Sequence, residues 1–228
     1  MKITYFGHAA FQIKLNAGKT ILFDPFISEN PFTKVTPEKL NPDFIVLTHA
    51  HADHLGNAIE IAKRTKATIV AQTDFAHVLA RTEGVAVIDY LNFGGTYYGP
   101  EFQLKLCPAW HTDAMDYQGI PLPMGVAAGF ALSAEDKLIY IAGDTGLFSD
   151  LKLVARKQPV DLAFLPIGGS YTMDSSDAAL AAEFLKAKKV IPIHYNTFPP
   201  IKADPIEFQQ MLPQGVVELP NVDEEFDF

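Results

Sequence analysis

Thr48-His49-Ala50-His51-Ala52-Asp53-His54 places three imidazoles and one carboxylate within positions 49–54. The stretch follows the apolar run Phe44–Leu47 and precedes a helical pattern that begins at Leu55. It is therefore predicted to form a strand-to-helix loop, where open α/β sheets usually bind their ligands. Imidazole nitrogens and carboxylate oxygens suit divalent ions such as Zn²⁺, and no cysteine lies nearby to close a structural site. We therefore predict an open, reactive metal centre, and regard a histidine-rich polar turn as the alternative.

Three further candidate ligands each follow another segment with the pattern of a strand: His111, Asp144 and His194. A single histidine at the end of a strand is more often a structural group than a ligand. A metal centre with several ligands, however, must recruit them from distant segments of the chain. Together with the cluster at 49–54, these three residues are therefore predicted to bind metal.

This set of residues resembles that of the metallo-β-lactamase superfamily, whose signature His-x-His-x-Asp-His stands here at positions 49–54. The single histidine, the Gly-Asp pair and the final histidine follow in the order of that family. The resemblance implies an α/β fold, a four-layer αβ/βα sandwich, and a hydrolase with a binuclear metal centre. It implies that one metal is bound by His49, His51 and His111, the other by Asp53, His54 and His194, and that Asp144 bridges them.

Three other segments of the sequence narrow the resemblance to one branch of the superfamily. The segments 1–11 and 20–25, together with Gly-Gly-Ser-Tyr-Thr-Met-Asp at 168–174, are similar to small metal-dependent hydrolases related to ascorbate-6-phosphate lactonase. This branch implies a small lactone or phosphoester as the substrate. Ser170 departs from the residue types expected in that loop, so the loop does not identify the substrate.

Three residues are candidates for roles around the metals. Two close divalent ions lower the pKa of a shared water and polarise the bond under attack. Asp53 is expected to orient this water as well as to bind metal, or only to fix its loop. His8 is a candidate general acid or oxyanion donor, or a structural histidine bonded to backbone. Asp24 is expected to accept the free N–H of a ligating imidazole, or simply to form a turn.

Length and patterning predict one domain over residues 1–228, because 48% hydrophobic residues suffice for one large core. The segments 25–42 and 111–123 are expected to be irregular lids beside the active site, or covers for a sheet edge or an oligomer contact. The acidic end, 223–228, is expected to be a solvated tail, with docking of its phenylalanines as the alternative. No apolar run approaches the ~20 residues that span a bilayer.

The formal net charge of −9 argues against a generic nucleic-acid binder, because non-specific affinity for phosphate backbones depends on Lys and Arg. We expect a small-molecule substrate, two divalent metals that are Zn²⁺ by default, and Mn²⁺, Fe²⁺ or Ni²⁺ as alternatives. The single cysteine, Cys107, fits a cytoplasmic protein. Self-association as a homo-oligomer stays open. The alternative functions are a non-catalytic metal-binding or sensor module and a phosphodiesterase acting on nucleic acid.

Overall fold

The computed structural model describes the backbone of residues 1–228 and every side chain except that of Tyr117. The chain forms two compact units, which are described separately below. Unit 1 comprises Met1–Gly95, Thr112–Ala127 and Asn221–Phe228, and unit 2 comprises Thr96–His111 and Ala128–Pro220. Each unit is assembled from segments that are separated in the sequence, so neither is a continuous stretch of chain. The single domain over 1–228 stays a prediction.

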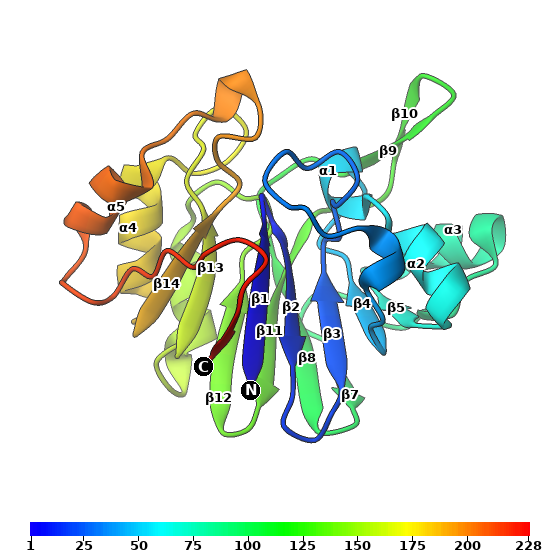
Figure 1. Cartoon of the computed structure of the whole chain (residues 1–228), viewed down its shortest axis with the longest axis horizontal. Helices are drawn as coiled ribbons and strands as arrows, with labels where there is room; N and C mark the ends of the chain where they lie inside the picture. The colour runs from blue at the N-terminus through cyan, green and yellow to red at the C-terminus, as the bar shows by residue number, and fades with distance from the viewer. The chain divides into compact units, whose positions relative to one another are not determined.

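Unit 1 is built on a seven-stranded sheet with the strand order β15-β1-β2-β3-β4-β5-β6 (Figure 1). Its strands are β1 (Lys2–Gly7), β2 (Ala10–Lys14), β3 (Thr20–Phe23), β4 (Phe44–Val46), β5 (Thr68–Val70), β6 (Val87–Ile88) and β15 (Glu225–Asp227). β1 and β3 run in the same direction because each is antiparallel to β2, and β4 is parallel to β3. The carboxyl ends of β1, β3 and β4 therefore meet at one edge of the sheet, where His8, Asp24 and Thr48 follow.

Helices cover the parallel part of this sheet. They are α1 (Ala52–Leu55), α2 (Ala58–Thr65), α3 (Thr73–Glu83) and the short 3-10 helix η1 (Pro37–Lys39). Helices α2 and α3 bury Ile61 and Phe75 in a core that also contains Ile45 and Ile69 of the strands. This burial anchors the chain on both sides of the 48–54 loop, because β4 precedes the loop and α2 follows it.

The segment 111–123, predicted to be irregular, contains a β-hairpin instead. Strands β9 (Ala114–Tyr117) and β10 (Ile120–Pro123) pair with each other as a separate two-stranded sheet. Gln118 and Gly119 both have positive φ, 56° and 79°, as a tight hairpin turn requires. Asp116 Oδ1 accepts a hydrogen bond from Gly119 N at 2.9 Å. The two turn residues therefore make this segment a hairpin. Figure 1 shows the hairpin extending away from the main sheet of unit 1.

The acidic end of the chain is not a solvated tail. Its residues Glu225–Asp227 form β15, which pairs antiparallel with β1 at the edge of the sheet. The Lys2 ammonium contacts the Glu225 carboxylate at 2.7 Å across this pair. Backbone pairing needs no apolar side chains, so an acidic segment can be a strand when a basic neighbour faces it.

Unit 2 is built on a six-stranded sheet with the strand order β14-β13-β12-β11-β8-β7. Its strands are β7 (Thr96–Gly99), β8 (Phe102–Pro108), β11 (Ala128–Ala134), β12 (Lys137–Ile141), β13 (Leu162–Pro166) and β14 (Lys189–Ile193). β8 and β12 are both antiparallel to β11, whereas β12, β13 and β14 are mutually parallel. The carboxyl ends of β8, β12 and β14 therefore share one edge, and His111, Asp144 and His194 come shortly after them.

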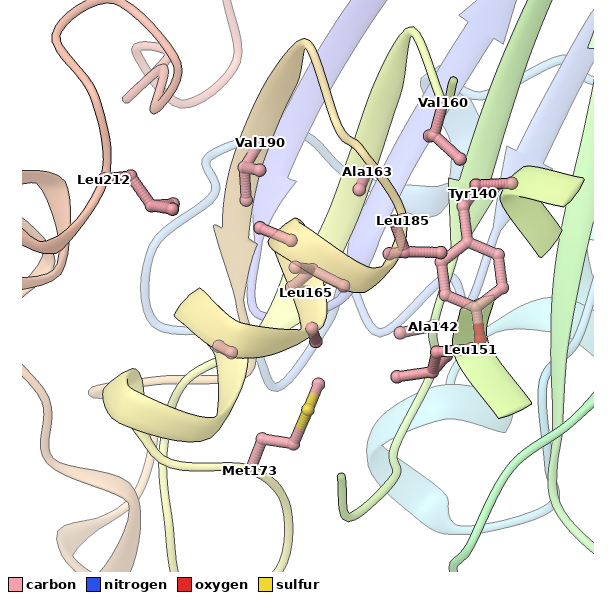
Figure 2. Packing of buried hydrophobic residues seen from close by; sticks show 14 of the residues in the cluster. Tyr140, Ala142, Leu151, Val160, Ala163, Leu165, Met173, Leu185, Val190 and Leu212 are labelled. Carbon is pink, nitrogen blue, oxygen red and sulfur yellow. The ribbon is translucent and has the colours of Figure 1, made fainter. Parts of the chain in front are cut away.

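The core of unit 2 lies between this sheet and its helices. The helices are η2 (Ser149–Arg156), α4 (Ser175–Phe184), η3 (Pro199–Ile201) and α5 (Pro205–Met211). Figure 2 shows Tyr140, Leu165 and Val190 of the strands packed with Leu185, the residue that follows α4, and Leu151 of η2. In the described part of the chain, no helix is both long and apolar enough to cross a membrane.

Candidate metal centre

His49 and His51 direct their ring nitrogens at each other on the loop after β4. Nε2 of His49 lies 2.9 Å from Nδ1 of His51. Two nitrogens on one tetrahedral Zn²⁺ stand about 3.3 Å apart when the bonds are about 2.05 Å long. The two rings are therefore spaced nearly as ligands that share one ion. His49 is buried and His51 half-buried, so the pair fits a divalent metal that remains accessible.

A second group in unit 1 consists of His8, Asp53 and His54. One ligand atom from each of these side chains lies within 4.8 Å of the others. Nε2 of His8 is 3.2 Å from Oδ2 of Asp53, and the carbonyl oxygen of His8 accepts a hydrogen bond from the Tyr5 hydroxyl at 3.0 Å. The Tyr5 hydroxyl thus fixes the backbone of His8, whereas the imidazole of His8 contacts a predicted metal ligand. The contact with Asp53 is compatible with the catalytic role considered for His8.

Asp24 makes the contact expected for a carboxylate that orients a ligand. Its Oδ2 lies 2.8 Å from His54 Nδ1 and accepts from Thr48 Oγ1 at 2.7 Å, while its Oδ1 accepts from Thr48 N at 2.8 Å. An ionised carboxylate can only accept, so His54 Nδ1–H donates to it and Nε2 retains the lone pair that a metal needs. Thr48 Oγ1 is also 3.0 Å from His49 Nδ1. The same polar network therefore holds both imidazoles.

Asp113 was not identified as a site residue from the sequence. Its Oδ1 accepts a hydrogen bond from Ala50 N at 2.8 Å, within the His49-Ala50-His51 stretch. Burial raises the pKa of the Asp113 carboxyl, while the Ala50 amide and the nearby His51 and His54 rings act in the opposite direction. A buried backbone N–H needs an acceptor, but no local pattern tells which distant residue supplies it.

In unit 2, one oxygen of Asp144 lies near two imidazoles. Oδ2 of Asp144 is 2.9 Å from His194 Nε2 and 3.7 Å from His111 Nε2. Asp144 and His194 are buried. Hydrogen bonds join the loops of His111 and Asp144, because Trp110 N donates to Thr145 Oγ1 at 2.9 Å and Gly146 N donates to Trp110 O at 3.1 Å. A carboxylate placed between two imidazoles can share its charge between two cations.

The loop 168–174, noted in the sequence for its composition, packs on the backbone of His194. A Cβ at Gly168 would overlap with the carbonyl oxygen of His194 and lie 2.8 Å from Ile201 Cβ. Met173 N donates to Thr145 O at 2.9 Å, next to Asp144. Gly168 thus lets this loop approach His194 closely, and Met173 fixes it to the Asp144 loop.

The structure brings the predicted ligands together in two sets, one in each unit. Unit 1 contains His49, His51, Asp53 and His54 with the candidate catalytic residue His8, and unit 2 contains His111, Asp144 and His194. The prediction that these residues follow strands is confirmed. Imidazole nitrogens and carboxylate oxygens without thiolate are a donor set that suits Zn²⁺, Mn²⁺, Fe²⁺ or Ni²⁺.

Comparison with known proteins decides the family. A family model described as a beta-lactamase superfamily domain matches residues 2–194. This chain belongs to the β-lactamase superfamily. Within the superfamily, it is 58% identical to a UPF0173 metal-dependent hydrolase of Oenococcus oeni over 233 aligned positions, with 100% of both chains covered. It is 53% identical to a protein of the same name from Ligilactobacillus salivarius over 227 positions, again with 100% of both chains covered.

A solved structure supports the same assignment. The metallo hydrolase Igni18 from the archaeon Ignicoccus hospitalis matches with a TM-score of 0.88 and 38% identity, covering 100% of this chain and 98% of that chain. The chain is therefore a metal-dependent hydrolase with the metallo-β-lactamase fold, as the 49–54 signature predicted. The narrower likeness to ascorbate-6-phosphate lactonase stays a prediction.

Proposed function

We propose that this superfamily member hydrolyses a small lactone at a binuclear metal centre, with Zn²⁺ as the default metal. The observation that carries the proposal is the position of Asp144 Oδ2, close to both His111 and His194. A mononuclear site would not need one carboxylate oxygen shared between two imidazole ligands. Two divalent ions would supply a water of lowered pKa and polarise the carbonyl group of the substrate.

In this proposal, the two metals have the ligands that the superfamily resemblance implies. One metal is bound by His49, His51 and His111, the other by Asp53, His54 and His194, with Asp144 shared. The 2.9 Å spacing between His49 Nε2 and His51 Nδ1 supports the first group. The contact between Asp24 and His54 Nδ1 supports the second, because it leaves Nε2 as the metal-binding nitrogen.

Asp53 and His8 would move the protons of the reaction. Asp53 would accept a hydrogen bond from the attacking water and orient it toward the carbonyl carbon. His8, whose Nε2 is 3.2 Å from Asp53 Oδ2, would hold that carboxylate in place. Opening the lactone breaks the bond between the carbonyl carbon and the ring oxygen. The proton lost by the water would then pass to that oxygen, with His8 as the candidate acid.

A neutral lactone suits the charge of the site better than a phosphoester does. Phosphate groups are usually bound by Arg or Lys, in addition to any metal. The segments 48–57, 107–113, 143–149 and 167–175, which carry or adjoin most of the predicted ligands, contain neither residue; Lys34 and Lys202 lie ten and eight residues beyond Asp24 and His194. The net charge of −9 also repels anions. The same charge disfavours a nucleic-acid phosphodiesterase.

Aromatic side chains on the ligand loops of unit 2 favour a substrate with an apolar part. Trp110, Tyr171 and Phe198 are 72%, 57% and 36% exposed. Trp110 directly precedes His111, and Phe198 is in the loop after His194. Ser170 Oγ donates to Pro200 O at 2.8 Å, so the loop of Tyr171 is bonded to that of Phe198. Exposed aromatic rings at the edge of a site bind alkyl or aryl groups by removing them from water.

The test begins with metal content. We expect about two equivalents of transition metal per chain in the wild type, and clearly less in His51→Ala and Asp144→Ala. The metal-loaded protein is then assayed on γ-lactones with short and long alkyl chains, and on a phosphodiester of p-nitrophenol. Lactone turnover that is absent in His51→Ala supports the proposal. Turnover of the phosphodiester alone, or of no substrate despite full metal loading, would contradict it.

We propose a cytoplasmic location for this reaction. Cys107 is a free, buried cysteine, which suits a reducing compartment. Self-association stays a prediction, and light scattering on the purified protein would test it.

A further inference from the structure

Asp113 is a buried carboxylate to which the proposed function gives no role. The residue is 6% exposed and lies immediately before the β9–β10 hairpin. Its Oδ1 accepts the N–H of Ala50, whereas its Oδ2 has no hydrogen-bond partner among the described atoms. Burying a carboxylate is unfavourable. A side chain of this kind in this position therefore needs a reason other than packing.

Asp113 bonds the ligand loop just beyond the point where its backbone hydrogen bonds to the neighbouring strand end. The amide of Leu47 still donates to Val70 O at 3.0 Å, in continuation of the β4–β5 ladder. Beyond that residue, Thr48 N donates to Asp24 Oδ1 and Ala50 N donates to Asp113 Oδ1, each at 2.8 Å. Two carboxylates from distant segments thus hold the backbone in place of a neighbouring strand.

Ala50 is the residue on which the geometry of the His49–His51 pair depends. The two imidazoles project from the residues on either side of Ala50, and their facing nitrogens are 2.9 Å apart. A rotation of the Ala50 peptide would turn both rings relative to each other. Metal affinity is sensitive to such changes, because residues that orient ligands typically alter it 10- to 100-fold when they are replaced.

We propose that Asp113 is a positioning residue, which holds the Ala50 amide so that His49 and His51 present their nitrogens to one metal ion. The inference rests on the proposed metal centre. It assigns to the segment before the hairpin a role in metal binding that its sequence does not indicate. Asp113 acts through the backbone and need not touch the substrate.

Three variants of Asp113 separate the hydrogen bond from other effects. Asp113→Ala removes the acceptor. Asp113→Asn keeps the Oδ1 acceptor. Its amide nitrogen replaces Oδ2, which accepts no hydrogen bond in the wild type, so no existing bond is lost. Asp113→Glu keeps the charge but moves the oxygens by one methylene. Asp116→Ala is the matched control, because Asp116 also bonds a backbone amide, that of Gly119 in the exposed hairpin turn, at 2.9 Å.

The experiment titrates each metal-free protein with Zn²⁺ by calorimetry against a competing chelator, and with Co²⁺ by visible absorption. We expect the affinity for at least one metal to fall about 10-fold or more in Asp113→Ala, with altered Co²⁺ bands. Asp113→Asn and Asp116→Ala should match the wild type. Circular dichroism checks folding, and if Asp113→Ala does not fold, Asp113→Glu is expected to show the reduced affinity and altered bands.

The outcomes are distinguishable from failure of the proposed function. A wild type that binds no metal would overturn the metal centre itself. A wild type that binds metal, with Asp113→Ala binding equally tightly, would overturn only the role of Asp113. An Asp113→Asn variant that is as weak as Asp113→Ala would overturn it too, because the asparagine retains the acceptor. If Asp113→Ala does not fold, a metal affinity of Asp113→Glu equal to that of the wild type would overturn the role of Asp113.

Discussion

Replacement of Asp24 by asparagine is the sharpest test of how the ligand loop is held. The change keeps the size of the side chain and the Oδ1 acceptor for Thr48 N, but converts Oδ2 into an NH₂ group. Oδ2 now accepts from Thr48 Oγ1 at 2.7 Å and lies 2.8 Å from His54 Nδ1. Both of these interactions need an acceptor, and the amide nitrogen is a donor.

The expected effect on stability follows from these two buried contacts. A buried polar group that loses its partner costs about 1–3 kcal/mol, so two such losses amount to about 2–6 kcal/mol. His54 can recover one contact if its proton moves from Nδ1 to Nε2, since Nδ1 then accepts from the new NH₂ group. We therefore expect a loss near the lower end, about 2 kcal/mol, in the free energy of unfolding of the metal-free protein.

The same proton shift should weaken metal binding. With the proton on Nε2, His54 no longer offers the nitrogen that the metal needs, and we expect an affinity loss of about 10- to 100-fold. Urea unfolding of the apoprotein and calorimetric titration with Zn²⁺ measure the two effects. Asp43→Asn is the control, because Asp43 bonds Thr20 N and the Lys19 ammonium in a more exposed position, before β4. Equal metal affinity in Asp24→Asn and the wild type would refute the reasoning.

Three other predictions concern unit 2. Gly168→Ala should lower the free energy of unfolding by about 1–3 kcal/mol and disturb metal binding through His194, because its Cβ would overlap with the His194 carbonyl oxygen. Gly146→Ala is the control. The nearest heavy atom would be 4.0 Å from its Cβ, so this change should affect neither stability nor metal binding. Tyr140→Phe should raise the free energy of unfolding by about 1 kcal/mol, because it removes a buried hydroxyl without a partner among the described atoms. Burial raises the pKa of Cys107 to about 11, so iodoacetamide at pH 8 should modify the native protein slowly and the urea-unfolded protein fast.

For the predictions on Tyr140 and Cys107, a specific result would contradict each one. Tyr5→Phe is the control for Tyr140, since the Tyr5 hydroxyl donates to His8 O at 3.0 Å and its loss should destabilise the protein. Equal losses in Tyr5→Phe and Tyr140→Phe would show that the Tyr140 hydroxyl has a partner. Rapid alkylation of native Cys107 at pH 8 would show that the thiol is accessible or that its pKa is near the ordinary value.

Strand ends were the part of the site that the sequence could predict. A buried strand is recognisable in the sequence by its apolar run, and the residue that follows the run lies at the edge of the sheet in any arrangement of the strands. His194 after β14 and Asp144 after β12 were found in this way. The signature at 49–54 then supplied the chemistry, because so many ligand-type side chains in one short loop have few other uses.

Contacts between distant loops could not be predicted in the same way. The pairing of Ala50 with Asp113 depends on the path of a segment 63 residues away, and neither residue has a local pattern that reveals it. The hairpin at 114–123 was missed because its decisive signal is one Gln-Gly turn inside a proline-containing segment. The strand β15 was missed because its acidic composition indicates a solvated tail, whereas its pairing uses the backbone.

Three residues of the site have the same unusual backbone conformation, which the amino-acid composition does not reveal. His8, Asp24 and His194 are each the first residue after a strand, and each has a positive φ, 56°, 39° and 54°. This conformation costs about 1–2 kcal/mol for a residue with a side chain, and glycine would adopt it more easily. Glycine, however, could supply neither an imidazole nor a carboxylate.

The three strained residues together amount to about 3–6 kcal/mol, a substantial part of the 5–15 kcal/mol that stabilises a typical domain. All three are buried and bonded: His8 through Asp53, Asp24 through Thr48 and His54, and His194 through Asp144. The left-handed turn at each strand end redirects the chain sharply, where an extended residue would continue the strand past the sheet. The polar networks that orient the proposed ligands therefore also hold these turns in place, which couples the stability of the sheet edges to the geometry of the metal site.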